Sequence, residues 1–283
     1  MKSSNPVFAR SAEFNGRSNA YGNTQTFPGY GQDQGYSDPS TWGTGTPTHE
    51  APTARMTIDS VVQKTGLTLA VVVVTAFLTW WWTGDLDGAV SQDQLSRIYG
   101  AVMIGSLGAF ALSMVNSFKR VISPALVLAF AALEGVALGG LSKLFDAQFG
   151  DGIVTGAVFG TFAAFAGTLA AYKFLGIKVG DKFRKGVMAA VFGMVGLGLL
   201  SLVLSFAGIQ TGLFGFGALG LLMSVVGLVL GVFMLILDFD FVEQGVAAGL
   251  DERESWRAAF GLTVSLVWIY TNLLRILAIF SQD

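Results

Sequence analysis

The chain has 283 residues, of which 52% are apolar and 13% are charged, about half the charged fraction of a typical soluble domain. It contains no cysteine, which excludes disulfides, thiolate chemistry and cysteine-ligated metal sites, and its one histidine is His49. The net charge of −2 gives no information on partners. The composition therefore indicates a membrane protein.

The first 60 residues differ from the rest of the chain. Residues 1–60 are rich in Gly, Ser, Thr, Asn, Gln and Tyr, carry few charges and show no apolar periodicity. No apolar signal-peptide core follows the N-terminal Met1-Lys2. We expect a disordered tail at 1–60, with binding through its scattered aromatic residues as the alternative role, and a membrane domain at 61–283.

Long uncharged runs predict seven membrane-spanning helices, because about 20 apolar residues cross the hydrocarbon core. The expected spans are 65–84, 98–118, 122–144, 152–173, 186–208, 215–238 and 258–280. The predicted fold class is an all-α membrane protein, a seven-transmembrane-helix bundle with a disordered N-terminal tail. Glycines spaced four residues apart predict close helix contacts, with the glycine-rich character of membrane helices as the plainer explanation. These pairs are Gly135/Gly139, Gly156/Gly160 and Gly227/Gly231.

Charges between the spans predict the orientation. The connection 85–96 has three aspartates and no Lys or Arg, whereas 119–120 and 173–185 are rich in Lys and Arg. The positive-inside rule then places the N-terminus in the cytoplasm and the C-terminus outside. The sixth connection, expected at 239–257, should also be inside although it is acidic, because acidic residues contribute little to orientation.

Two aspartates end the sixth predicted span. On a continuing helix Asp238 shares a face with apolar residues three and four positions away, whereas Asp240 shares a face with Glu243 and Gln244. We therefore expect Asp240 at a wet, charged helix end and Asp238 turned toward the interior. A gate or ion site at Asp238 is the functional hypothesis, and an aspartate that simply ends the helix at the interface is the alternative.

Glu134 lies near the middle of the third span, where a charge costs at least ~2.5–3.5 kcal/mol on insertion scales. We expect it to serve an ion pathway or relay, and the alternative is a protonated side chain that makes one structural interhelical hydrogen bond. Carboxylates are hard oxygen ligands, so Asp238 and Glu134 are the candidate Ca²⁺ ligands.

A polar stripe runs along the seventh predicted span. Such a stripe normally faces the bundle interior or water, although an arginine near the helix end can instead reach the outer surface. Its members are Arg257, Gly261, Ser265, Trp268, Asn272 and Arg275. An enzyme is not expected, because the spans contain no histidine for hydrolysis, the seventh span has no Schiff-base lysine and no nucleotide-binding fingerprint is present.

Three motifs resemble the transmembrane Bax-inhibitor-motif family, in its bacterial branch, over about residues 60–280. They are Ser123-Pro124-Ala125-Leu126 running into Leu133-Glu134-Gly135, Leu237-Asp238, and Tyr270-Thr271-Asn272-Leu273-Leu274-Arg275. The resemblance implies a multi-pass protein of the bacterial plasma membrane that acts as a pH-sensitive calcium leak or modulates membrane proteases or cell death.

The resemblance also implies a proton-sharing pair of aspartates, one closing the sixth helix and one in the seventh. Asp238 matches the first, but Ser265 stands where the second is expected, ten residues before Arg275. A serine cannot share a proton as a carboxylate does, so a coupled titration should be lost, or replaced through Glu134. Lys119 or Arg120 approximates a basic residue that the family has near the inner end of its second helix.

Two functions remain open from the sequence. The leading hypothesis is a cation leak, with Ca²⁺ as the ion, no other cofactor and Asp238 as the proton-sensitive element. The second is a non-conducting protein that binds and modulates a membrane protease or other membrane partner through the tail and the acidic connection 239–257. Membrane lipids are partners in both, nucleic acid in neither, and a secondary transporter is disfavoured because no inverted repeat is visible.

Overall fold

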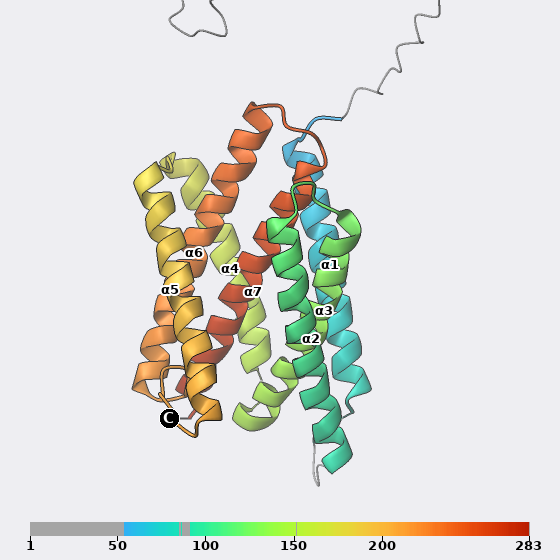
Figure 1. Cartoon of the computed structure of the whole chain (residues 1–283), viewed down its shortest axis with the longest axis vertical. Helices are drawn as coiled ribbons and strands as arrows, with labels where there is room; N and C mark the ends of the chain where they lie inside the picture. Colours follow the sequence, from blue (N-terminus) through green and yellow to red (C-terminus); the bar gives the residue numbers. More distant parts are fainter. Residues whose placement is uncertain (1–53, 85, 87–90, 151, 283) are drawn as a thin grey trace, which may run out of the picture. The chain divides into compact units, whose positions relative to one another are not determined.

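The computed structural model describes residues 54–84, 86, 91–150 and 152–282, and these form seven α-helices (Figure 1). Each helix is long and apolar enough to cross a membrane, which confirms the predicted fold class. The helices are α1 (Ile58–Trp82), α2 (Gln92–Phe118), α3 (Pro124–Phe149), α4 (Ile153–Leu175), α5 (Asp181–Phe206), α6 (Ala218–Ala247) and α7 (Glu254–Phe280). The predicted tail lies outside the described residues up to position 53.

The last residues of the predicted tail are ordered, because they form the start of α1. Thr57 caps the helix by accepting a hydrogen bond from the backbone of Ser60, whose side chain in turn accepts from the backbone of Thr57. Residues 54–56 pair with the α6–α7 connection: the amide of Met56 donates to the carbonyl of Leu250 at 2.7 Å. The described part of the membrane domain therefore begins at residue 54, within the predicted tail 1–60.

Helices α3 and α7 form the centre of the bundle. Half of the most apolar stretch of α3 and 44% of that of α7 is buried, against 11% for α5. α3 packs on α1 and α2, whereas α7 packs on α6, α4, α1 and α3, and α5 packs mainly on α6. The residues most shielded from lipid are therefore those of α3 and α7.

The glycine pairs lie where helices touch, as predicted. Gly135 and Gly139 of α3 contact the backbone of α1, so that a side chain at either position would collide with it. Gly227 and Gly231 of α6 lie against side chains of α7, those of Asn272 and Ile269. The sequence prediction missed a further approach, in which a Cβ on Gly105 of α2 would lie 2.6 Å from the backbone nitrogen of Ala137.

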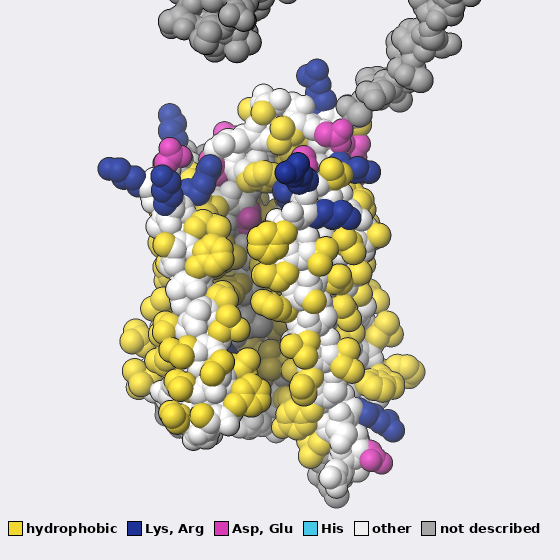
Figure 2. All heavy atoms as spheres, viewed as in Figure 1, with side chains coloured by type: hydrophobic (Ala, Val, Ile, Leu, Met, Phe, Trp, Pro, Cys, Tyr) yellow, Lys and Arg dark blue, Asp and Glu magenta, His cyan; other side chains and the backbone are white. Residues whose placement is uncertain are grey.

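The chain segments predicted to be cytoplasmic meet at one end of the bundle. Arg257 at the start of α7 donates to the backbone carbonyl of Arg120 in the α2–α3 connection, and Tyr172 near the end of α4 donates to Glu243 of α6. Figure 2 shows most of the Lys, Arg, Asp and Glu side chains gathered at this end, with hydrophobic side chains below. We refer to it as the charged end.

The sixth connection is shorter than the sequence predicted. α6 continues to Ala247, so the connection spans 248–253 and not 239–257, and Asp238 lies nine residues before the end of the helix. The helix continues because Phe239 packs into the core and Asp240 is paired across to α5.

Candidate functional site

Asp238 of α6 and Ser265 of α7 form a polar contact inside the bundle. The hydroxyl of Ser265 donates to Oδ2 of Asp238 at 2.5 Å, and Ser265 is only 1% exposed. Gly261, one turn earlier on α7, leaves room for the carboxylate: a Cβ there would lie 2.9 Å from Oδ1 of Asp238. Two small residues on α7 thus accommodate one acidic side chain from α6.

The structure places Ser265 where the sequence resemblance called for a second carboxylate. Because a hydroxyl can both donate and accept, it can bond the ionised or the protonated form of Asp238. The contact between α6 and α7 is therefore preserved in either protonation state. What is missing is a second acid to take up a proton.

The polar stripe of α7 continues along α6. Nε1 of Trp268 donates to the carbonyl of Gly227 at 2.8 Å, and Nδ2 of Asn272 donates to the carbonyl of Trp268 at 2.7 Å. Asn272 is buried and its side chain lies over Gly227. From Gly261 to Asn272 the stripe faces the bundle interior, as predicted.

Arg275, the last member of the stripe, lies under the α5–α6 connection. Its guanidinium carbon is 5.4 Å from the ring centroid of Phe214, which is within the range of a cation–π contact. Nη2 is buried and has no hydrogen-bond partner among the described residues. The guanidinium of Arg275 thus packs against the protein at Phe214.

Asp240 is not at a wet helix end, contrary to the prediction. It is buried, accepts a hydrogen bond from Nη2 of Arg184 at 2.8 Å and another from Nε2 of Gln244 at 2.7 Å. The periodicity that placed Gln244 on the face of Asp240 is confirmed, but α5 covers that face. Arg184, which is half-exposed, connects this carboxylate to the charged end.

The two basic residues predicted to lie near the inner end of the second helix flank its end. Lys119 follows α2 directly, Arg120 is next in the chain, and both are exposed. Their position at the charged end is as expected for a basic contact there. The backbone carbonyl of Arg120, and not a charge, is what Arg257 binds at 2.8 Å.

Glu134 lies at a different place from Asp238. It lines a cavity of about 290 Å³ between α2, α3 and α7, and Asp238 is not among the lining residues. Trp268 lines this cavity and also donates to the carbonyl of Gly227 on α6. Ser265, and not Glu134, occupies the position opposite Asp238.

Among the described residues, no group of three or more His, Cys, Asp or Glu side chains is placed to hold a metal ion. Asp238 and Glu134, the candidate Ca²⁺ ligands, lie at separate places, since Glu134 lines the cavity and Asp238 bonds to Ser265. A tightly held Ca²⁺ takes six to eight oxygen ligands, which two separate carboxylates do not supply.

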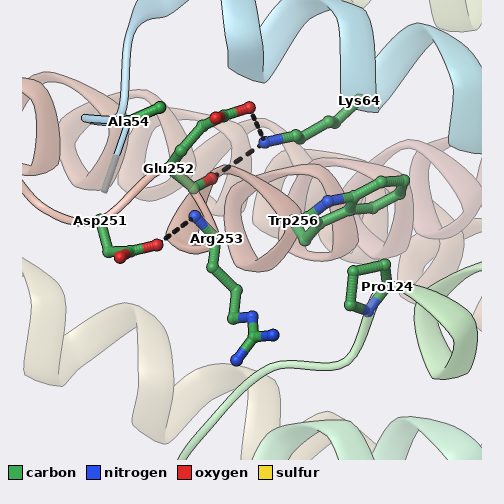
Figure 3. Close-up of a pocket in the computed structure, with 7 residues that line it drawn as sticks. All are labelled: Ala54, Lys64, Pro124, Asp251, Glu252, Arg253 and Trp256. Atoms are coloured by element: carbon green, nitrogen blue, oxygen red, sulfur yellow. Dashed lines mark hydrogen bonds and ion pairs between the residues drawn. The ribbon is translucent and has the colours of Figure 1, made fainter. Parts of the chain in front are cut away.

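A second pocket, of about 300 Å³, opens at the charged end (Figure 3). Its lining comes from α1, the first residue of α3, the α6–α7 connection, the first turn of α7 and the segment that precedes α1. Nζ of Lys64 binds Oε1 of Glu252 at 2.8 Å, and lies 5.8 Å from the ring centroid of Trp256. Sequence reasoning missed this pairing because the two partners are 188 residues apart.

The family can be assigned by comparison with known proteins. A family model described as Bax inhibitor 1 like matches residues 5–282. The chain belongs to this family. The match begins well before residue 60, so the tail is included in what the Bax inhibitor 1 like model covers, whereas the motif resemblance began near residue 60. A search of curated proteins found no match to the chain.

Within this Bax inhibitor 1 like chain, the motif residues fall at helix contacts. Asp238 meets α7 through Ser265, and Tyr270 of the last motif shares a 2.6 Å hydrogen bond with Ser142 of α3. The third motif thus ties α7 to α3, while Asn272 in the same motif faces α6. Asp238 is the acidic residue at the contact between α6 and the polar stripe of α7.

Proposed function

We propose that this Bax inhibitor 1 like protein is a cation leak of the bacterial plasma membrane, with its N-terminus in the cytoplasm and Ca²⁺ as the favoured ion. The observation that carries the proposal is the Asp238–Ser265 contact: an ionisable carboxylate held inside a membrane bundle by a neutral hydroxyl. Acidic residues within membrane segments are rare and mark ion or proton pathways.

Asp238 is suited to act near the cytoplasmic mouth. It lies nine residues before the end of α6, which corresponds to about 14 Å along the helix axis at ~1.5 Å per residue. An ionised Asp238 attracts a cation, and carbonyl oxygens complete its transient coordination. A protonated Asp238 is neutral and removes that attraction, so the leak should fall as the pH is lowered.

Calcium flux into dye-loaded proteoliposomes tests the proposal. The wild-type protein is compared across pH with Asp238→Asn, Glu134→Gln and, as a control, Asp93→Asn in the exposed first turn of α2. We expect pH-dependent flux for wild type and Asp93→Asn and low, pH-independent flux for Asp238→Asn. Glu134→Gln should follow wild type if Asp238 alone controls the pathway. Equal, pH-independent flux in all four proteins would remove both intramembrane acids from the mechanism.

A further inference from the structure

The cavity at Glu134 has the composition of a ligand site. Polar side chains from two helices, including Ser106 of α2 and Thr271 of α7, share its wall with the rings of Phe110 and Trp268. A few polar groups on a mostly apolar wall are typical of small-molecule sites, and a volume of about 290 Å³ is at the lower end of their range. It suits a single chain or ring and is too small for a two-chain phospholipid.

Glu134 has no partner within the part of the chain that the structure describes, where no hydrogen bond or ion pair reaches it. Three of the neighbouring donors are engaged elsewhere. The hydroxyl of Ser113 bonds the carbonyl of Phe110 at 2.8 Å, that of Thr271 bonds the carbonyl of Trp268 at 3.0 Å, and the indole of Trp268 is used by α6. An unpaired carboxyl group at membrane depth raises the free energy of the protein. A ligand that forms a hydrogen bond or ion pair with this group removes that cost and therefore binds more tightly.

The cavity opens toward the bilayer. Ser106 and Phe110 at its rim are exposed, and α2 packs mainly on α3, which leaves the side of the cavity at α2 uncovered within the described part of the chain. Figure 2 shows this face hollowed between the side chains over α5 and those over α2. Glu134 lies ten residues into α3, or about 15 Å along its axis, which is half of a ~30 Å hydrocarbon core. A ligand of Glu134 therefore enters from the lipid, and the polar group of the ligand leaves the water when it binds.

We propose that this cavity binds a small hydrophobic amine from the bilayer, with the amine nitrogen at the Glu134 carboxyl and the chain along Phe110. The charge balance favours an amine over other lipid-soluble molecules. A neutral amine and a neutral carboxylic acid share one proton between nitrogen and oxygen, so their pair is net neutral wherever that proton lies. Fatty acids bring a second carboxyl and alcohols make only a neutral hydrogen bond, which is weaker than a charge-assisted one.

Trp268 reports on the site, because its ring lines the cavity. Tryptophan emission is measured in nanodiscs of zwitterionic lipid during titration with a bromoalkylamine, and with the bromoalkanol of equal length as the control for partitioning. The same titration of Trp268→Phe measures the quenching of the other tryptophans, which is then subtracted from the wild-type signal. We expect saturable quenching of Trp268 by the amine, and half-saturation at ~10-fold higher concentration for the alcohol and for Glu134→Gln.

Two further variants test whether the effect is specific to this cavity. Ala109→Leu fills part of the cavity and keeps the glutamate at 134, and it should also abolish saturable quenching, since Ala109 lines the cavity and is 1% exposed. Asp238→Asn should quench as wild type does, whatever it does to ion flux. Equal quenching by amine and alcohol, or undiminished quenching in either Glu134→Gln or Ala109→Leu, would overturn the proposal.

Discussion

At the scale of single residues, Asp238 and Ser265 keep the helix contact that a pair of acids would make but lack the coupled titration of such a pair. The hydrogen bond at 2.5 Å keeps α6 and α7 in contact, as a shared proton between two carboxylates would. Two coupled acids lose their protons in two macroscopic steps, whereas one acid beside a hydroxyl has a single step. The position of the contact was predictable from the motif spacing, and the identity of its second member changes only the proton chemistry.

Replacing Ser265 with aspartate should restore the coupled behaviour. In Ser265→Asp two carboxyl groups face each other across a distance that now holds a hydrogen bond, so they should titrate as a pair. We expect the flux-against-pH curve, which has one proton step in wild type, to acquire a second step. Calcium flux across pH measures this, with Ser265→Ala as the control that removes the hydroxyl and keeps one step. A single step in Ser265→Asp would contradict the account.

Gly261 offers a steric test of the same contact. A methyl group at this position would approach Oδ1 of Asp238 to 2.9 Å, so Gly261→Ala should displace the carboxylate and destabilise the bundle by ~1–3 kcal/mol. Gly100→Ala in α2 is the matched control, because no atom lies within 4 Å of its added methyl. Thermal unfolding in detergent compares the two. Equal melting temperatures for both variants would show that Gly261 is not needed for space.

At the scale of elements, α6 shows where sequence periodicity is informative and where it is insufficient. The period of 3.6 residues correctly put Asp240 on one face with Gln244. It could not show that Arg184, 56 residues earlier, covers that face, and so the helix was predicted to end where it continues for nine more residues. The sequence of one helix predicts which of its residues share a face. It does not predict an ion pair between two helices, because that depends on how the helices pack.

The Arg184–Asp240 pair should hold α5 against α6. Arg184→Gln leaves a buried carboxylate with Gln244 as its remaining hydrogen-bond donor among the described residues, and we expect a loss of ~1–3 kcal/mol because one buried polar group loses a charged donor. Adding Asp240→Asn should recover part of the loss, since the unpaired charge is then removed. A double-mutant cycle of unfolding free energies measures the coupling. Additive losses would show that the pair contributes nothing.

The segment before α1 should matter for stability from residue 54 onward. Deleting 1–53 leaves the capping box of Thr57 and the pairing of 54–56 with 250–252, whereas deleting 1–60 removes both. We expect the shorter deletion to retain the melting temperature and flux of the full chain and the longer one to lower the melting temperature. Loss of a co-purifying membrane partner in the shorter deletion, together with no flux from the full chain, would favour the non-conducting, protease-binding alternative, whereas unchanged flux favours the leak. A normal melting temperature after deletion of 1–60 would contradict the assigned role of the capped start.

At the scale of the whole molecule, the sequence predicted much of the fold and less of the site. Uncharged runs located all seven helices, and loop charges correctly grouped the even-numbered connections at one end, because both signals lie within short stretches of chain. Contacts between residues far apart in the sequence could not be predicted. The contact of Lys64 with Glu252 and the separation of Glu134 from Asp238 are set by helix packing, which no single stretch encodes.

The most direct test of the central claim is calcium flux through reconstituted protein with Asp238→Asn, measured at one acidic and one neutral pH. The proposal predicts that wild type conducts more at neutral than at acidic pH and that the variant conducts little at both, because asparagine keeps the shape of the side chain and removes its charge. Wild-type flux that is retained by Asp238→Asn with the same pH dependence would contradict the account.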